Sequence, residues 1–490
     1  MMEQERAIFK SQDRFIELWN TVKEAAQRGE PIDRMEHDLW NGLLNLGRLM
    51  LQETVDQQGT GDLGPTLEYE GKTVRRLDAL YEKRYVSVFG EIIIQRTVYG
   101  TRESQKQEVI PLDARLNLPA SDFSFLLQDW SQAFCVRNAY QQSSQLLERI
   151  LGIGQSVRSL ESMNRAMAQE VEAFRQAQPT PAVEEEGPIL VLTADGKGVP
   201  MRREKAVEPG RRKRGEKANP KRQACVGAVY TIEPFYREAE DVVNEMERKE
   251  QKANRPVPRH KQMRAELTRA IEGEEVNGKD RIFHWLEEEE KARNPEREKA
   301  VVCLMDGDRA LWNKAKEYGW DTIGILDIYH VMERLWSAAY CFVPEGGEEA
   351  EVFVRTRLTR ILEGEVGRVI GGLRQMGTKQ GLRGAKKKQL KSVITYLENN
   401  REYMQYDYYL AFGYPIGSGV VEGACRHVVK DRMEGTGMHW RTEGAQSMLD
   451  LRTVFLNEEW EDFQAHRIEQ NVHQLYPYRE KIQEIWEQAA

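Results

Sequence analysis

The sequence lacks four features that would assign the chain to other classes of protein. No window of 18 or more apolar residues occurs, which argues against a membrane-spanning helix. The first fifteen residues are polar and lack a hydrophobic stretch, so we expect no signal peptide there. The five cysteines are scattered singly without a C-x-x-C pair, and we therefore expect no disulfide framework, no zinc and a reducing, cytoplasmic setting. The balance of 71 Lys and Arg against 79 Asp and Glu gives a net charge of −8, so any nucleic-acid-binding surface must be local.

What is present is enough apolar material for a large folded protein. Hydrophobic residues make up 40% of the 490 positions, which suits two to four domains with their own cores. Changes in hydrophobic period and composition predict the following division. We expect an N-terminal helical region over 1–60, a small β unit over 61–117, a helix-turn-helix region over 118–176, a linker over 177–188, an α/β domain over 189–465 with a helical insertion at about 340–412, and a C-terminal helical tail over 466–490.

The segment around Gly152 and Gly154 has the outline of a helix-turn-helix. A helical period precedes the two glycines, and Ser156 is a suitable N-cap for a second helix. In a DNA-binding protein the second helix of such a motif enters the major groove. A plain pair of antiparallel helices would give the same pattern.

Three short apolar runs of the α/β domain each end in an aspartate. ILVLTA precedes Asp195, AVVCLM precedes Asp306 and TIGIL precedes Asp327. Continuous apolar runs suit strands that are buried on both faces, and strand ends are where open α/β sheets bind ligands. Gly196 and Gly307 follow the first two aspartates, where we expect the chain to turn out of the strand.

Aspartates on neighbouring strands would repel one another unless a cation lay between them. Oxygen ligands of this kind favour Mg²⁺, with Mn²⁺ as a substitute. Glu422 is the best third carboxylate, because Ser418 can cap a helix that carries it among glycines. The alternatives are that each aspartate only caps the next turn and that Glu422 is a solvated residue of an amphipathic helix.

Four motifs, in this order, resemble those of one transposase family. DGKGVPMR, MDGDRALW, ILDIYHVMERLW and GSGVVEGACRHVVKDRMEGTGMHW are similar to segments of the Kra-type bacterial insertion-sequence transposases, over roughly residues 65–465. Asp195, Asp306 and Glu422 resemble the DDE triad of ribonuclease-H-like transposases. Asp327 and His330 match the D-x-x-H signature found in several DDE groups, including Mutator-like elements, with a helical insertion before the glutamate.

The resemblance implies a fold, a reaction and a set of partners. It implies a ribonuclease-H-like domain in which Asp195, Asp306 and Glu422 hold two Mg²⁺ ions for DNA cleavage and strand transfer. Asp306 is preferred over Asp308 because it ends the strand directly. Asp327 and His330 are expected to support the metal carboxylates rather than bind metal, with a helix cap and an ordinary core histidine as the alternative. The implied partners are double-stranded DNA and a second or further copy of the chain, in a bacterial, nucleoid-associated setting without a membrane.

Local basic segments could supply the affinity for DNA that the overall charge does not. Between Arg202 and Arg222, ten of 21 residues are Lys or Arg against three Glu. A second basic cluster lies in the helical insertion, and solvated surface is the alternative for both. The residues that we expect to contact DNA are Arg202, Arg203, Arg211, Arg212, Lys213, Arg214, Lys386, Lys387, Lys388, Arg426, Trp440 and Arg441.

These expectations lead to one principal hypothesis and two alternatives. The principal hypothesis is a DNA transposase that binds the terminal inverted repeats of an insertion sequence, cleaves their 3′ ends and joins them to target DNA. A metal-dependent nuclease without strand transfer is the first alternative. A DNA-binding regulator with an inert nuclease fold is the second, and three acidic residues that repel one another argue against it.

Overall fold

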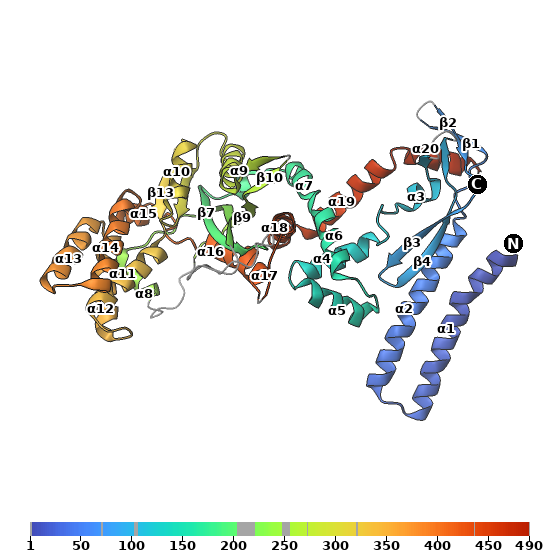
Figure 1. Ribbon diagram of the computed structural model, residues 1–490, viewed down its shortest axis with the longest axis horizontal. Coiled ribbons are helices and arrows are strands. Elements are labelled where there is room, and N and C mark those ends of the chain that lie inside the picture. The colour runs from blue at the N-terminus through green and yellow to red at the C-terminus, as the bar shows by residue number, and fades with distance from the viewer. Residues whose placement is uncertain are drawn as a thin grey trace, which may run out of the picture. The chain divides into compact units, whose positions relative to one another are not determined.

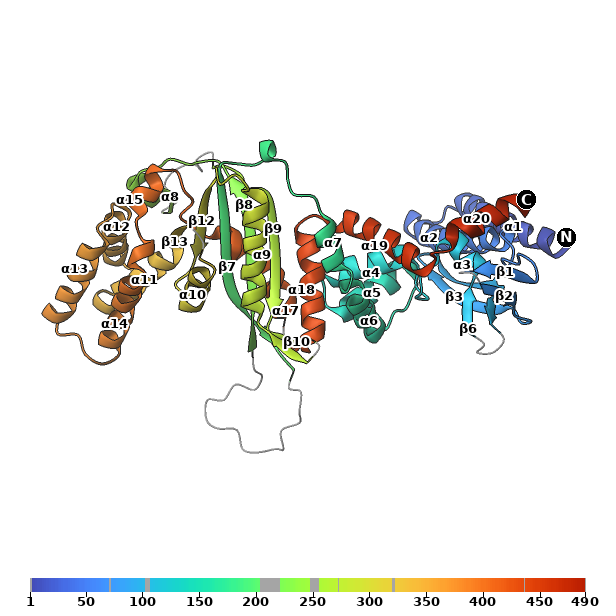
Figure 2. The same cartoon turned by 90° about the horizontal axis from the view of Figure 1, so that it is seen from above.

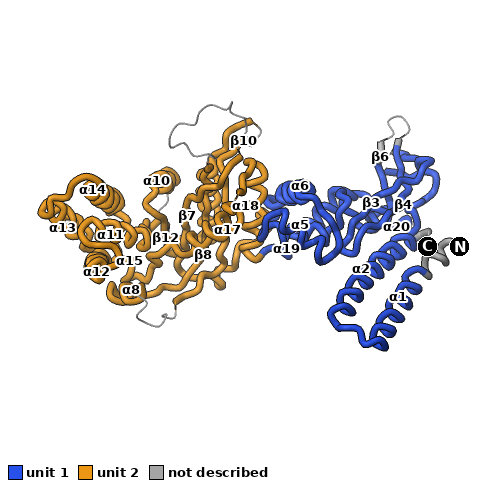
Figure 3. Tube along the Cα trace, turned by 60° about the horizontal axis from the view of Figure 1, so that its bottom comes forward, with its two compact units in different colours: residues 1–174, 459–490 blue, residues 175–458 orange. Residues whose placement is uncertain are grey.

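The computed structural model divides the chain into two compact units. Unit 1 comprises Met1–Phe174 and Glu459–Ala490, and unit 2 comprises Arg175–Glu458 (Figure 3). The structure describes residues 2–69, 72–101, 106–202, 221–246, 255–271, 273–319, 322–435 and 437–489. Among these residues, no helix has both the length and the apolar character needed to cross a lipid bilayer.

Unit 1 begins with a pair of long antiparallel helices, α1 (Met2–Arg28) and α2 (Ile32–Gln57) (Figure 1). Gly29 turns the chain between them with a φ of +65°, in the region that favours glycine. Leu18 of α1 packs against Gly42 of α2, because the missing side chain of the glycine leaves room for it. The helical period of residues 1–60 therefore corresponds to a helical hairpin.

A small β region follows the hairpin. Strands β3 and β4 form a hairpin with Val88 and Phe89 at its tip, and the other four strands form a sheet in the order β1-β2-β5-β6. Alternate residues of β4, Ile92 and Ile94, are buried beneath α2. The elements are β1 (Thr66–Tyr69), β2 (Lys72–Arg76), β3 (Tyr81–Ser87), β4 (Gly90–Arg96), β5 (Tyr99–Thr101), β6 (Lys106–Val109) and α3 (Pro111–Leu116).

The expected helix-turn-helix segment contains two helices joined by a glycine turn. Helices α4 (Phe125–Cys135), α5 (Tyr140–Leu151) and α6 (Val157–Ala168) pack around Leu127, Leu147 and Leu160. Gly152 ends α5 in the left-handed conformation, and the Ser156 hydroxyl accepts the Ser159 N–H at 3.0 Å. Ser156 is therefore the N-cap of α6, as predicted.

The C-terminal helices α19 (Trp460–Leu475) and α20 (Arg479–Ala489) return to unit 1. The Trp460 indole donates to Asp129 Oδ1 at 2.7 Å, and the Tyr476 hydroxyl donates to the Leu118 carbonyl at 2.6 Å. Phe463 meets the ring of Phe174 edge to face. The N-terminal part of unit 1 thus shares its core with segments made about 300 residues later.

Unit 2 is built on a mixed five-stranded sheet in the order β13-β12-β7-β8-β9. Strands β7, β8 and β9 are antiparallel, whereas β12 and β13 run parallel to β7. The predicted α/β class is therefore confirmed as a mixed sheet with helices. The strands are β7 (Ile189–Pro200), β8 (Lys221–Ile232), β9 (Arg259–Leu267), β12 (Ala300–Met305) and β13 (Ile323–Leu326), with a small hairpin of β10 (Arg269–Ile271) and β11 (Glu274–Val276) beside them.

Helices cover both faces of this sheet, which explains its unbroken apolar runs. On β7, Ile189 and Val191 face the helices that follow β13, whereas Leu190 and Leu192 face α9 and α10. Figures 1 and 2 show the helices of the insertion gathered beyond the β13 edge. Between β8 and residue 419, the helices of unit 2 are α8 (Ala239–Met246), α9 (Gly278–Arg293), α10 (Arg309–Glu317), α11 (Ile328–Phe342), α12 (Glu348–Leu362), α13 (Val366–Lys379), α14 (Gly384–Asn399) and α15 (Tyr406–Ala411). Unit 2 also contains the 3-10 turns η1 (Val183–Glu185) and η2 (Arg401–Tyr403).

The last segment of unit 2 passes beside the sheet and closes its β9 edge. It consists of α16 (Gly419–Ala424), a π-helical turn η3 (Cys425–Lys430), α17 (Asp431–Met433) and α18 (Thr442–Leu456). The Gln446 side chain of α18 accepts the Leu267 N–H and donates to the Ala265 carbonyl, each at 2.9 Å. These bonds satisfy backbone groups of an edge strand that would otherwise be open to pairing with another chain.

A buried cluster of ion pairs holds the chain in place just before β7 begins. Both oxygens of Glu186 are engaged, because Arg293 Nε donates to Oε1 at 2.6 Å and Lys299 Nζ lies 2.9 Å from Oε2. The Arg293 guanidinium also donates to the His260 carbonyl at 3.1 Å. The segment 177–188, expected as a linker, therefore ends in a residue anchored inside unit 2.

Candidate metal centre

Asp195 lies within a strand, which corrects the expectation that it ends one. Strand β7 pairs with β8 as far as Pro200, whereas its pairing with β12 ends at Leu192. Asp195 therefore lies just beyond the part of β7 that β12 covers, with its backbone still held by β8. Gly196 does not turn the chain out of the strand. It gives space to the Gln223 side chain, whose Nε2 would lie 2.0 Å from an added Cβ.

Asp306 follows the last residue of β12, as predicted. Its Oδ1 accepts the Asp308 N–H at 2.8 Å, and its carbonyl accepts the Trp312 indole at 2.6 Å. Burial raises the pKa of the Asp306 carboxyl, and the negative charge of Asp195 raises it further. The two aspartates are therefore close enough to interact, although they are more than 100 residues apart in sequence.

Asp327 connects three segments around the same point. It follows β13, caps α11 by accepting the Tyr329 N–H at 3.2 Å, and accepts the Ser418 N–H at 3.1 Å. Its own N–H donates to the Met305 carbonyl at 2.9 Å. This fully buried carboxylate thus holds the end of β12, the start of α11 and the approach to α16 together.

Glu422 reaches this cluster from the first turn of α16. Ser418 occupies the N-cap position, but its side chain makes no capping bond, so the predicted side-chain cap is absent. Its backbone carbonyl accepts the Glu422 N–H at 3.0 Å instead. Burial and then the charge of Asp327 raise the pKa of Glu422, and Asp195 contributes in the same direction.

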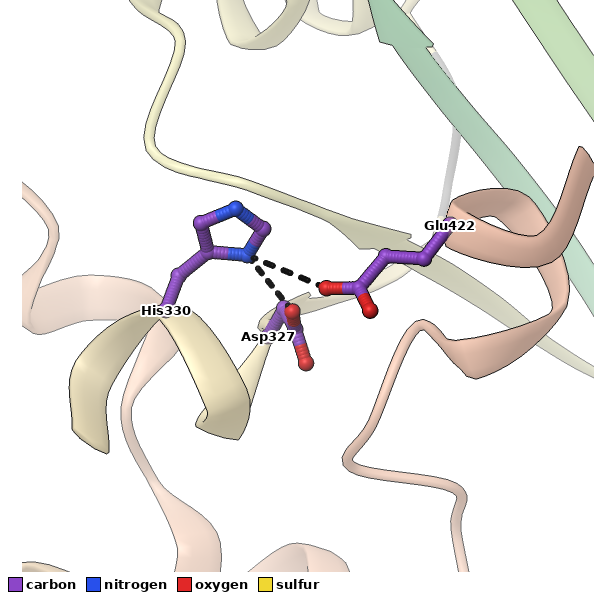
Figure 4. Close-up of side chains that lie close together, drawn as sticks. All are labelled: Asp327, His330 and Glu422. Carbon is purple, nitrogen blue, oxygen red and sulfur yellow. Dashed lines mark hydrogen bonds and ion pairs between the residues drawn. The ribbon is translucent and has the colours of Figure 1, made fainter. Parts of the chain in front are cut away.

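His330 lies between two of the carboxylates (Figure 4). Its Nδ1 is 2.6 Å from Asp327 Oδ2 and 3.9 Å from Glu422 Oε1. The pKa of His330 is raised to about 9, chiefly by its hydrogen bond with Asp327. Burial lowers this pKa, but the negative charges of Asp327, Asp306 and Glu422 also raise it. Asp327, His330 and Glu422 offer ligand atoms that all lie within 4.8 Å of one another.

The donor set suits a hard divalent cation. The carboxylates of Asp327 and Glu422 lie beside His330, and the charge of Asp195 acts on the pKa values of both Asp306 and Glu422. Carboxylate oxygens of this kind match Mg²⁺ or Mn²⁺. Among the residues that the structure describes, the candidate metal-binding group consists of Asp327, His330 and Glu422. Of the three predicted ligands only Glu422 belongs to it, Asp195 and Asp306 do not, and Asp327 and His330 were expected to lie outside the ligand set.

Two thiols flank Asp195 and were not predicted as part of the site. The Cys425 side chain is hydrogen-bonded to Asp195, and burial raises its pKa well above the usual range. Burial also raises the pKa of Cys225 to about 12. Both thiols are therefore protonated and neutral at physiological pH, and Cys425 can donate to the carboxylate. The motif GACRHV contains this cysteine, but nothing in its spacing distinguished it from a core residue.

Some of the residues expected to contact DNA lie outside the described residues, and the others lie in three places. Arg203, Arg211, Arg212, Lys213 and Arg214 lie outside the described residues. Arg202 and Arg441 are exposed next to each other in the fold, because the Arg202 N–H donates to the Trp440 carbonyl at 2.7 Å. The Trp440 ring is buried, and its indole donates to the Met433 carbonyl at 3.1 Å. Lys386, Lys387 and Lys388 are exposed at the start of α14, and Arg426 is exposed 3.7 Å from Asp431.

A cavity of about 230 Å³ adjoins the carboxylate cluster. Tyr329 and Gly417, which neighbour Asp327 and Ser418 in the chain, form part of its wall. Arg237 and Arg255 line it together with Glu245, to which both are paired. The Arg237 guanidinium lies 4.7 Å from the centre of the Phe235 ring. The cavity therefore presents cationic and aromatic groups next to the acidic site.

No protein-family model and no curated protein match the chain. Among solved structures, it is similar to the Drosophila P element transposase strand transfer complex, with 9% sequence identity and a TM-score of 0.22, over 74% of this chain and 83% of that chain. A TM-score of 0.22 does not establish a shared fold.

Proposed function

We propose that the chain is a DNA transposase whose unit 2 is a ribonuclease-H-like catalytic domain. The observation that supports the proposal is the acidic group of Asp327, His330 and Glu422, which lies next to the end of the strand that precedes Asp306. The charge of Asp195 also raises the pKa values of Asp306 and Glu422, which is consistent with a site shared by these three segments. The four motifs that resemble Kra-type transposases supply those three residues. A sheet of antiparallel and parallel strands with helices on both faces is compatible with that fold.

Asp195, Asp306 and Glu422 would hold two divalent cations. When bound, such cations activate a water or a 3′-hydroxyl and stabilise the leaving oxygen of a phosphodiester. The chain itself fixes the carboxylates: β8 holds Asp195, the Asp308 N–H orients Asp306, and Asp327 anchors the loop before Glu422. No covalent enzyme intermediate is needed, because positioning and charge neutralisation dominate phosphoryl transfer.

Asp327 and His330 act as positioning residues in this proposal. The Asp327 carboxylate is occupied by the Tyr329 and Ser418 N–H groups and by His330. His330 places a positive charge between Asp327 and Glu422. Groups that orient metal ligands in this way contribute about 10–100-fold to metal affinity or activity.

Replacing His330 by Gln should lower metal-dependent DNA cleavage by about 10–100-fold. The amide cannot carry the positive charge between the two carboxylates, so Glu422 is held less firmly. Cleavage rates at increasing Mn²⁺ would test this, and we expect the half-maximal Mn²⁺ concentration to rise while DNA affinity stays unchanged. A purely structural role is indicated instead if the variant loses thermal stability and DNA affinity together.

The exposed lysines of α14 should contribute to DNA affinity through phosphate contacts. A triple change of Lys386, Lys387 and Lys388 to Gln should reduce the slope of log affinity against log salt by up to about 2.7, because each phosphate contact contributes about 0.9. Fluorescence anisotropy of a labelled duplex at several salt concentrations measures this slope. Lys291→Gln is the matched control, since Lys291 is exposed but paired with Glu287 at 2.8 Å in an acidic run. An unchanged slope in the triple variant would show that these lysines of α14 do not contact DNA phosphates.

Two DNA substrates separate the proposal from its alternatives. The first is a supercoiled plasmid with Mg²⁺ or Mn²⁺, and the second is a labelled duplex with a pre-cut 3′ end from DNA that borders the chain's own reading frame. Metal-dependent cutting together with joining of the pre-cut end supports a transposase. Cutting without joining supports a nuclease, and binding without either reaction supports a regulator.

A further inference from the structure

One long apolar face of the α1–α2 hairpin is exposed among the residues that the structure describes. Ile32, Leu39, Leu43 and Met50 lie within about 20° of one line along α2, since successive helical residues are separated by about 100°. They and two residues of α1, Phe15 and Trp19, each leave between 38% and 77% of their surface exposed. We call these six residues the apolar face.

The two helices present these side chains on the same side of the hairpin. Phe15 and Trp19 stand three residues before and one residue after Leu18, and Leu39 and Leu43 stand in the same relation to Gly42. Leu18 and Gly42 touch where the antiparallel helices meet. Because the two helices run in opposite directions, residues at the same sequence distance from this contact lie on the same side of the hairpin. Phe15 and Trp19 therefore lie on the same side as Leu39 and Leu43.

The remaining surface of the hairpin is not suited to nucleic acid. Between residues 10 and 57 there are six Lys and Arg against nine Asp and Glu. Phosphate binding requires an excess of positive charge, so DNA is not the expected occupant of this face. The opposite side of α2 carries polar residues such as His37 and Asn41, which are exposed.

We propose that the apolar face binds the same face of a second copy of this chain and forms a four-helix bundle. The six side chains would bury on the order of 500–600 Å² per copy, most of the ~800 Å² per partner that a stable interface buries. The near-equivalence of α1 and α2 about the Leu18–Gly42 contact makes the face self-complementary, as a two-fold interface requires. Such pairing goes beyond the proposed function, does not depend on it, and would occur without DNA.

Charges at the border of the face favour one arrangement of the two copies. Lys23 stands five residues from Leu18 toward the turn, and Glu36 stands six residues from Gly42 toward the same turn. Both are exposed on the outer edge of the face, at the same level. A two-fold axis parallel to the helices brings Lys23 of each copy next to Glu36 of the other. These ion pairs contribute more to orientation than to affinity.

The mass of the full-length protein without DNA tests the proposal by sedimentation equilibrium. We expect the wild type to be a dimer and the double variant Leu39→Asp/Leu43→Asp to dissociate at least 100-fold more readily. His37→Asp/Asn41→Asp is the matched control, because it adds two acidic residues at the same spacing on the polar side, and it should remain dimeric. Far-UV circular dichroism should be the same for all three proteins.

A charge exchange provides a second, milder test. Lys23→Glu should weaken the dimer several-fold, and Lys23→Glu/Glu36→Lys should restore it. A monomeric wild type, or a Leu39→Asp/Leu43→Asp variant that keeps the dimer's mass, would overturn the proposal. Failure of the exchange to restore the dimer would overturn the parallel-axis arrangement.

Discussion

Replacing Asp306 by Asn should abolish metal-dependent DNA cleavage, whereas the same change at Asp308 should leave it almost intact. Asp306 follows β12 and interacts with Asp195, so it is placed to hold a cation. Asp308, two residues later, caps α10 by accepting the Ala310 N–H at 2.8 Å. Asn caps helices about as well as Asp, so Asp308→Asn keeps the fold while removing one nearby negative charge.

The expected loss for Asp306→Asn is at least about 10²–10³-fold, the effect of removing one group that stabilises charge in a transition state. Initial rates of plasmid nicking in Mn²⁺ would measure it. Equal losses in both variants would show that overall charge, not a ligand at position 306, controls the reaction.

Thermal unfolding gives a readout of the same site that does not depend on activity. The raised pKa of Asp306 means that the folded state holds this proton more tightly than the unfolded chain does. Without cations, the wild type therefore loses stability as the pH rises from the ordinary value of 3.8 through the folded pKa, and Asp306→Asn avoids this loss. At pH 7, added Mn²⁺ should raise the Tm of the wild type and of Asp308→Asn but not that of Asp306→Asn.

Replacing Glu186 by Ala should destabilise unit 2 by about 3–5 kcal/mol, the usual cost of removing one partner of a buried ion pair. The change leaves the buried Arg293 guanidinium and the nearby Lys299 ammonium without their shared carboxylate. The positive charges cannot be hydrated without opening the contact between η1 and the end of α9. Chemical denaturation followed by tryptophan fluorescence would measure the change in free energy of unfolding.

Glu185→Ala is the matched control for this prediction. Glu185 is exposed and lies 3.7 Å from His260, so its removal should change stability by less than about 1 kcal/mol. A similar small effect in Glu186→Ala would mean that water reaches the cluster and replaces the lost carboxylate.

The apolar runs made the strands of unit 2 predictable, but not where each strand ends. ILVLTA, AVVCLM and TIGIL correspond to β7, β12 and β13, because residues on both faces are buried. The end of β7 was misplaced at Asp195 because the following residues, GKGVP, lose their apolar character while β8 continues to pair with them. Backbone pairing with a partner strand leaves no periodic trace in such a short polar segment.

Sequence patterns also could not predict the parts of the site that depend on contacts between residues far apart in the chain. The D-x-x-H signature identified Asp327 and His330 in the sequence, and the structure adds that Glu422 lies beside them. The hydrogen bond from Cys425 to Asp195 and the burial of Glu186 arise from segments far apart in the chain. Glu186 in particular sits in a Pro- and Glu-rich stretch whose composition indicates solvent exposure.

The return of α19 and α20 to unit 1 has a consequence for the order of events on the ribosome. The core of unit 1 stays incomplete until Phe463, Trp460 and Tyr476 have been synthesised. At 5–20 residues per second, translation of the roughly 280 intervening residues takes on the order of 15–60 s. Unit 2 is contiguous in sequence, so it can fold during this delay. A chaperone that binds exposed apolar segments would therefore find residues 1–174 accessible long after they have been synthesised.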